Sequence, residues 1–391
     1  MLTEGTKTRS SPEIAQATEA LGATLVSGGG QDAAQVSLNV MPGRLAEAMA
    51  IMADVVMNPA FAKDELDRQK SQTLDGLSVA FQQPGQLASF ATSPAIYAGT
   101  PFGHVAGGTP ASVANLTEAD LKAIHAAYYR PDNAILILTG DITPEAGFAL
   151  AEKTFGGWSK PATPAPDQPA ITPKAAPRAI VIDLPGTGQA AVTVAKLGIP
   201  RSAPDYYPGV VANTVLGGGY SARLNQEIRI KRGLSYGASS SLAPRRTTGL
   251  FRAAAQTKNE SAPQVLDLIT TEMGKLAAEP ASVEELKARK SVLIGGFGRS
   301  IETTDGLAGI LGNLALYGLP ISEFNAYTAK VDAVTPDQVL TFAKAHLDPA
   351  GVTVIIAGDA KAFAEPLKAK LPNLEVIPAA ELDLDKASLR K

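Results

Sequence analysis

Two segments of this chain repeat one another at a fixed spacing, and this repeat constrains the fold more than any other feature. Residues 116–141 (LTEADLKAIHAAYYRPDNAILILTGD) align without a gap with residues 334–359 (VTPDQVLTFAKAHLDPAGVTVIIAGD), so Thr117 pairs with Thr335 at an offset of 335 − 117 = 218. A second pair, DELDRQK at 64–70 and EELKARK at 284–290, aligns at 285 − 65 = 220. Because two separate blocks keep nearly one offset, the sequence indicates a duplicated domain.

Helical and strand patterns alternate within each half. Apolar residues recur at helical spacing in three early segments, and alternating or continuous apolar runs mark strands. We therefore predict helices over residues 9–21 and 45–57, one beginning at Ala62 and one ending near Tyr129, with strands at Ala23–Ser27, Ala34–Val40, Ala134–Thr139, Gly249–Thr257 and Val352–Ile356. Residues 86–113 are expected to be irregular. The pattern favours an α+β fold of two homologous tandem domains, each a mixed, mostly antiparallel sheet with helices covering one face.

A proline- and alanine-rich stretch separates the two halves. It covers residues 161–177 (PATPAPDQPAITPKAAP) and is typical of an extended, semi-rigid linker. We therefore predict an N-terminal domain over residues 1–160 and a C-terminal domain over residues 178–391. A length of 391 residues suits two domains of ordinary size.

Composition excludes several classes of function. The net charge of −3 gives no reason to expect a nucleic-acid partner, and no apolar stretch has the length of a membrane span. The absence of cysteine excludes disulfides, thiolate zinc sites and cysteine nucleophiles. The two triglycine tracts lack the spacing or the lysine of a phosphate-binding loop. Localisation stays open, although the alanine-rich, cysteine-free composition favours a bacterial periplasm over the cytoplasm.

The most informative single stretch is residues 216–241, LGGGYSARLNQEIRIKRGLSYGASSS. A glycine turn precedes a short helix that Ser221 is expected to cap and Gly233 to end. A strand is expected over residues 234–239. Taken alone, Arg229 is an ordinary last-turn cation and Tyr236 a half-buried strand aromatic.

The same stretch resembles the corresponding segment of the pitrilysin, insulinase and mitochondrial processing peptidase family of zinc metallopeptidases. In that family an arginine and a tyrosine seven residues apart hold the substrate backbone, and Arg229 and Tyr236 match this spacing. Duplicated α+β halves joined by a linker are also the architecture of the family, so the resemblance covers nearly the whole chain. It implies a peptide or unfolded protein as the substrate.

The zinc site of the family is not recognisable in this sequence. Catalytic members carry His-x-x-Glu-His immediately before a segment like MLTEGT, which here forms residues 1–6, so we expect a fragment or a wrongly assigned start. The third zinc ligand aligns with Gly76 and an accompanying acidic position with Gln69, although a shift of one residue would bring Asp75 to the ligand position. His104, His125 and His346 are isolated and show no metal-ligand spacing. The sequence therefore assigns this chain no catalytic residue, metal ligand or cofactor of its own.

A chain that lacks the zinc positions but retains Arg229 and Tyr236 resembles one class of family member in particular. This class is the non-catalytic, substrate-binding subunit of a bacterial or mitochondrial heterodimer, whose homologous partner carries the zinc. The expected partners are therefore a zinc-bearing peptidase subunit and a peptide substrate. Two alternatives stay open: an N-terminally truncated but active zinc peptidase, and a purely structural subunit of the same fold.

Overall fold

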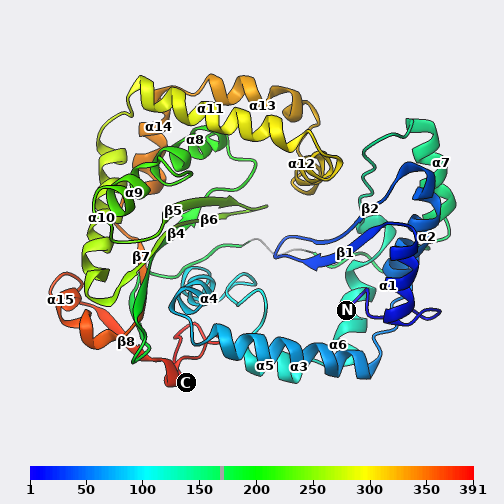
Figure 1. Ribbon diagram of the computed structural model, residues 1–391, viewed down its shortest axis with the longest axis horizontal. Helices are drawn as coiled ribbons and strands as arrows, with labels where there is room; N and C mark the ends of the chain where they lie inside the picture. The colour runs from blue at the N-terminus through cyan, green and yellow to red at the C-terminus, as the bar shows by residue number, and fades with distance from the viewer. Residues whose placement is uncertain (168–170) are drawn as a thin grey trace. The chain divides into compact units, whose positions relative to one another are not determined.

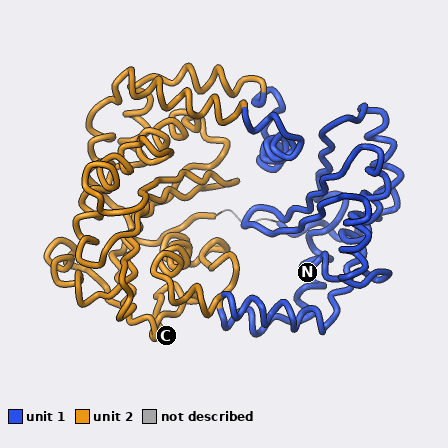
Figure 2. The backbone as a smooth tube through the Cα atoms, viewed as in Figure 1, with its two compact units in different colours: residues 1–76, 110–169, 299–324 blue, residues 77–109, 170–298, 325–391 orange. Residues whose placement is uncertain are grey.

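The computed structural model describes residues 1–167 and 171–391, and residues 168–170 of the expected linker lie outside the described part. The chain forms two compact units that interleave along the sequence (Figure 1, Figure 2). Unit 1 comprises Met1–Gly76, Pro110–Pro169 and Arg299–Phe324, and unit 2 comprises Leu77–Thr109, Ala170–Gly298 and Asn325–Lys391. Three helices run across unit boundaries: α3 (Lys63–Ala80), α11 (Val283–Ser300) and α13 (Ser322–Asp332).

Unit 1 consists mostly of helices and contains one two-stranded antiparallel hairpin. Its elements are α1 (Ser11–Ala20), β1 (Thr24–Gly29), β2 (Ala34–Asn39), η1 (Pro42–Arg44), α2 (Leu45–Met57), α5 (Pro110–Asn115), α6 (Glu118–Tyr128), η2 (Pro131–Asn133), α7 (Pro144–Phe155) and α12 (Thr304–Leu316). The helices and strands expected before residue 70 are confirmed. Ser10 caps α1 and forms a capping box with Glu13.

Unit 2 contains a six-stranded mixed sheet of order β5-β6-β4-β7-β3-β8. Its elements are α4 (Pro84–Ile96), β3 (Ala179–Asp183), β4 (Gln189–Gly198), α8 (Tyr206–Leu216), α9 (Arg223–Asn225), η3 (Gln226–Ile230), β5 (Ala238–Pro244), β6 (Gly249–Lys258), η4 (Asn259–Ser261), α10 (Ala262–Ala278), α14 (Pro336–Phe342), η5 (Ala343–Leu347), β7 (Thr353–Gly358), η6 (Ala360–Ala362), α15 (Ala364–Lys368), β8 (Leu374–Pro378) and η7 (Ala379–Glu381). Strands β4, β5, β6 and β7 pair antiparallel, and β3 pairs parallel with β7 and β8. The α+β class is therefore confirmed. In the described part of the chain, no helix is both long and apolar enough to cross a membrane.

Equivalent helices recur at the expected offset. α3 and α11 have equal lengths and start 220 residues apart, as do α4 and α12. Thr117 and Thr335 both accept a hydrogen bond from a backbone N–H three residues later and both form capping boxes. The duplication inferred from sequence is thus visible in the local structure.

The prediction of a buried strand at residues 134–139 is wrong. Its repeat equivalent, β7, is buried throughout because β4 and β3 pair with its two edges and its side chains pack into the apolar clusters on the two faces of the sheet. Residues 134–139 have no strand partner in the described part of the chain, and Ile135 is 64% exposed. An apolar run predicts burial only when neighbouring strands are present to supply it.

The prediction that residues 86–113 are irregular is also wrong, because α4 and α5 occupy much of this stretch. Proline suits the first turn of a helix, and Pro84 takes that place in α4. The small apolar side chains of α4, among them Leu87, Ala88 and Ala91, are fully buried in a cluster with Ile180 and Ile355 of the sheet. Helices therefore cover both faces of the unit 2 sheet, not one face as expected.

The equivalent helices α4 and α12 each belong to a different unit from most of the helix that precedes them. These preceding helices are α3 for α4 and α11 for α12. α4 packs on the sheet of unit 2, although most of α3 before it belongs to unit 1. α12 belongs to unit 1, where Asp305 accepts a hydrogen bond from Asn39 (3.1 Å) and Ile137 Cδ1 lies against Gly312. Each half of the sequence therefore supplies one helix to the unit formed mainly by the other half.

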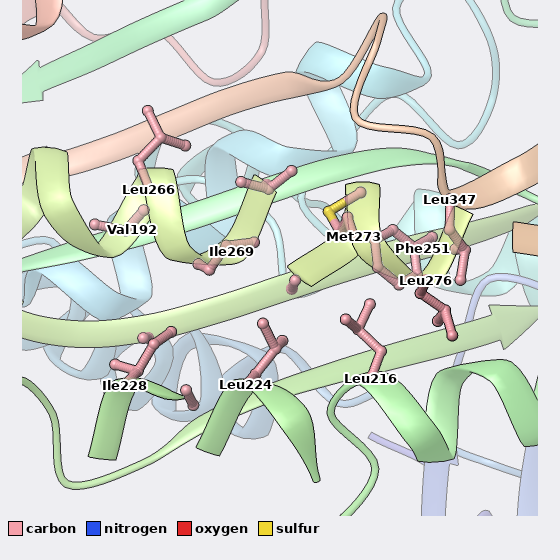
Figure 3. Close-up of a cluster of buried hydrophobic side chains, with 14 of the residues drawn as sticks. Val192, Leu216, Leu224, Ile228, Phe251, Leu266, Ile269, Met273, Leu276 and Leu347 are labelled. Carbon is pink, nitrogen blue, oxygen red and sulfur yellow. The ribbon is translucent and has the colours of Figure 1, made fainter. Parts of the chain in front are cut away.

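The main core of unit 2 lies between the sheet and the helices that cover its other face. Figure 3 shows Leu216, Leu224 and Ile228 pointing toward the side chains of α10, among them Ile269 and Met273. All five are fully buried. The short helical segment α9–η3 is therefore fixed by its apolar face, which determines where its polar side chains lie.

The surroundings of Asp54 on α2 predict that the stability of unit 1 depends on pH. Burial of its carboxyl raises the pKa, but hydrogen bonds from Thr6, Thr8, Asn58 and Arg9 outweigh burial and hold the pKa of Asp54 below its ordinary value. A lowered folded-state pKa contributes stability above the unfolded-state pKa of about 4, and this stability is lost as pH falls through the folded-state value. We expect Asp54→Asn to lower the free energy of unfolding at pH 7 by about 1–3 kcal/mol, and by less at pH 3.

Urea unfolding at both pH values checks this expectation, with Asp75→Asn, at an exposed position of α3, as the matched control. A deficit in Asp54→Asn that is equally large at pH 3 and pH 7 would contradict the assignment.

Candidate functional site

The glycine tract before α9 is pressed against the edge strand β5. A Cβ on Gly217 would stand 2.3 Å from the backbone nitrogen of Ser240, and one on Gly218 would stand 2.6 Å from Thr214 Cα. The Ser240 N–H donates to the Gly217 carbonyl (3.1 Å). Two glycines of the tract are therefore required by close backbone approach, and the turn that carries Tyr220 is anchored on the sheet.

Ser221 does not cap the helix as expected. α9 begins after Ala222, and the oxygens of Ser221 instead accept hydrogen bonds from Arg289 of α11, at 3.0 Å to Oγ and 2.6 Å to the carbonyl. A second link joins the same elements, because Arg223 donates two hydrogen bonds to Glu285 (2.9 and 2.7 Å), which raise the pKa of Arg223. Ser221 is therefore bonded by Arg289, a buried residue that is distant in sequence, and local sequence patterns could not show this contact.

Arg229 lies in the π-helical turn η3 that continues α9. As expected, Gly233 closes this turn, with φ of +63° and an N–H that donates to the Arg229 carbonyl (2.9 Å). Glu227 is held by Lys231 and Arg232, whose hydrogen bonds lower the pKa of its carboxyl against the opposing effect of burial. Glu227 therefore forms ion pairs with Lys231 and Arg232 and not with Arg229. The guanidinium carbon of Arg229 lies 5.0 Å from the ring centroid of Tyr220.

Tyr236 stands at the tip of a turn and is 88% exposed. Ser235 Oγ donates to the Gly237 carbonyl (2.6 Å) and accepts from the Gly237 N–H (3.1 Å), and this local bonding delays the start of β5 to Ala238. The strand expected from residue 234 is therefore too long, and the interpretation of Tyr236 as a half-buried aromatic is wrong. In the described structure no hydrogen bond joins the side chains of Arg229 and Tyr236, so their joint role stays a prediction.

Two further residues of this segment, Tyr220 and Asn225, could not be singled out by motif or spacing. Tyr220 follows the glycine tract and is 64% exposed. Asn225 is buried beside Leu224, donates from Nδ2 to the Tyr220 carbonyl (2.5 Å) and accepts at Oδ1 from the Ala238 N–H (3.3 Å). An amide side chain on the apolar face of a short helix was the available signal, because a buried amide requires partners.

Gly76, which aligns with the expected zinc ligand, does not fit a zinc ion. Gly76 has no donor, and both Gly76 and Asp75 are exposed on α3. Among the described residues, no group of three or more histidine, aspartate and glutamate side chains is arranged to hold a metal.

The histidines have other surroundings. His125 Nε2 lies 2.7 Å from the Val56 carbonyl and its ring stacks on Tyr129, His346 Nε2 lies 2.9 Å from Asp205 Oδ2, and His104 is exposed.

Family models match both parts of the sequence. Residues 1–106 match the model described as "Insulinase (Peptidase family M16)", and residues 115–293, which include Arg229 and Tyr236, match the model described as "Peptidase M16 inactive domain". The fold and the matched segments thus define a peptidase-like protein. The chain belongs to the insulinase family, peptidase family M16.

Individual relatives agree with this assignment. The crystal structure of a peptidase M16 inactive domain from Pseudomonas fluorescens has 32% sequence identity and a TM-score of 0.85, with 92% of this chain and 86% of that chain covered. An uncharacterized zinc protease of Mycobacterium leprae is 26% identical over 87% of this chain and 76% of its own length. A non-peptidase homolog of Helicobacter pylori is 23% identical over 92% of this chain and 83% of its own length.

Proposed function

We propose that this protein is a non-catalytic, substrate-binding subunit of a heterodimeric zinc metalloendopeptidase that acts on peptides or unfolded proteins. The observation that carries the proposal is the coexistence of Arg229 and exposed Tyr236 on an anchored segment with Gly76, which has no ligand atom, at the expected metal position. The match of residues 115–293 to an inactive-type domain supports the same conclusion.

The chemistry of the two side chains suits a peptide backbone. A guanidinium donates charge-assisted hydrogen bonds and a phenol donates one more, and both can point at the carbonyl oxygen of an extended peptide. Such donors stabilise the negative charge that develops on this oxygen during hydrolysis. In the proposed complex the homologous partner subunit supplies the zinc and the attacking water, and this chain orients the peptide and stabilises the oxyanion.

Reconstitution tests the proposal. Cleavage of a fluorogenic unfolded peptide is measured with this chain alone, with the zinc-bearing homologous subunit from the same source alone, and with the two mixed. We expect no cleavage by this chain, and cleavage by the mixture that a chelator abolishes and added zinc restores.

Each alternative predicts another result. Chelator-sensitive cleavage by this chain alone would favour an active peptidase. Mixtures no more active than the zinc-bearing subunit alone would favour a structural subunit.

A further inference from the structure

Tyr220 presents a large aromatic ring to solvent from a backbone that is fixed on several sides. Gly217, three residues earlier, is pressed on β5, and Ser221, the next residue, is held by Arg289. The Tyr220 carbonyl itself accepts the Asn225 hydrogen bond. An exposed aromatic side chain on a rigid support is the residue type that contributes most in binding patches, because little conformational entropy is lost when it contacts a ligand.

Asn225 connects the three segments that carry Tyr220, Arg229 and Tyr236. It precedes Arg229 by four residues in the same helical segment. Its amide nitrogen bonds the turn of Tyr220, and its amide oxygen bonds Ala238, two residues after Tyr236. One buried side chain therefore fixes the relative positions of all three backbones.

The ring of Tyr220 is in turn placed against Arg229. A guanidinium carbon 5.0 Å from a ring centroid lies within the range of a cation–π contact. An arginine stacked on a ring keeps its N–H groups in the plane of the guanidinium, and its edge is left available for a carbonyl or carboxylate oxygen. The contact restricts a side chain that would otherwise sample many rotamers.

Strand pairing of a peptide with the start of β5 is disfavoured by the same structure. The N–H of Ala238 already donates to Asn225, and the N–H of Ser240 already donates to Gly217. These two outward backbone donors are therefore occupied, which leaves side chains such as Tyr220, Arg229 and Tyr236 as the donors for a peptide at this end of β5.

We propose that Tyr220 is a positioning residue for substrate binding, which stacks on Arg229 and orients its guanidinium toward the backbone carbonyl of an extended peptide. The inference rests on the proposed function for its substrate, but the orientation of Arg229 by Tyr220 can be measured without it. The recognition patch of this chain then consists of Tyr220, Arg229 and Tyr236.

The first test needs no partner or substrate. The Nε–Hε resonance of Arg229 is recorded by NMR in the arginine-labelled chain and assigned by its loss in Arg229→Ala. We expect Tyr220→Leu to shift it by removing the ring, Tyr220→Phe to leave it nearly in place, and Tyr128→Leu, an exposed tyrosine on α6, to leave it unchanged. An unshifted resonance in Tyr220→Leu would overturn the positioning role, whatever the fate of the proposed function.

The second test uses the reconstituted heterodimer and a double-mutant cycle. We expect Tyr220→Leu to lower kcat/KM about threefold to tenfold and Tyr220→Phe to restore it. In an Arg229→Ala background, Tyr220→Leu is expected to cause no further loss, since its effect acts through Arg229. An equal loss in both backgrounds would show that Tyr220 acts independently and overturn the proposal. If Arg229→Ala itself has no effect, the proposed function fails, and the NMR result still decides the placement of Arg229.

Discussion

Replacement of Arg229 by alanine is expected to lower kcat/KM of the reconstituted heterodimer about 100-fold, because removing one donor to a developing oxyanion typically has an effect of this size. The truncation should leave the fold intact, since in the described part of the chain the Arg229 guanidinium donates to no buried acceptor, and the α9–η3 segment is fixed by Leu224 and Ile228. The measurement is steady-state cleavage of an unfolded peptide, with circular dichroism to verify the fold. We expect most of the loss in kcat, because the contact strengthens in the transition state.

The matched control is Arg246→Ala, at an exposed arginine between β5 and β6 of the same unit. It should retain wild-type kcat/KM, and Tyr236→Phe should lose activity by an intermediate factor, since it removes one neutral donor. Equal activities for Arg229→Ala and Arg246→Ala would refute the role given to Arg229.

Substitution of Gly217 by alanine is expected to give the largest loss of stability in the site. Its Cβ would stand 2.3 Å from Ser240 N and 2.7 Å from Ser240 Oγ, so the turn and β5 must separate. Overpacking against backbone typically costs about 1–3 kcal/mol of unfolding free energy, and here it also disrupts the hydrogen bond from Ser240 to Gly217. We expect about 3 kcal/mol in total from urea unfolding.

Gly219→Ala provides the control within the same tract, because a Cβ at this position meets nothing within 4 Å. Its free energy of unfolding should stay within about 0.5 kcal/mol of wild type. Similar losses for the two variants would mean that the tract is fixed by something other than the close approach to β5.

Local patterns predicted the local structure well. The helix over residues 9–21, the apolar helix Leu45–Met57 and the stop at Gly233 depend on residues close in sequence, and all three are confirmed. The duplication could also be predicted, since it requires only a comparison of the sequence with itself. The family assignment followed from the same motifs and is confirmed by the family models.

Most of the features that were predicted wrongly depend on contacts with residues that are distant in sequence. Residues 134–139 have the apolar character of a strand, but strand formation depends on neighbours that the segment itself does not specify. Ser221 has the character of a helix cap, but Arg289, 68 residues away, holds it. Tyr236 has the character of a strand aromatic, but the bonding of Ser235 with Gly237 turns it out to solvent. The joint role proposed for half-buried Arg229 and exposed Tyr236 involves a partner subunit, so local sequence patterns do not determine it.

The exchange of α4 and α12 has a consequence for how the chain reaches its native state. The sheet of unit 2 receives α4 from the first half of the sequence, while residues 137–140 of unit 1 pack against α12 from the second half. Each half forms an apolar cluster of its own, around Val192 in the second half and around Ile14 in the first, but the packing of α4 and of α12 needs residues of the other half. Contacts between residues so far apart in sequence are formed late and slow folding. The native packing of α4 and α12 is consequently completed only when both halves have been made, and a nick in the segment that joins the halves would leave two pieces that each still hold a helix of the other.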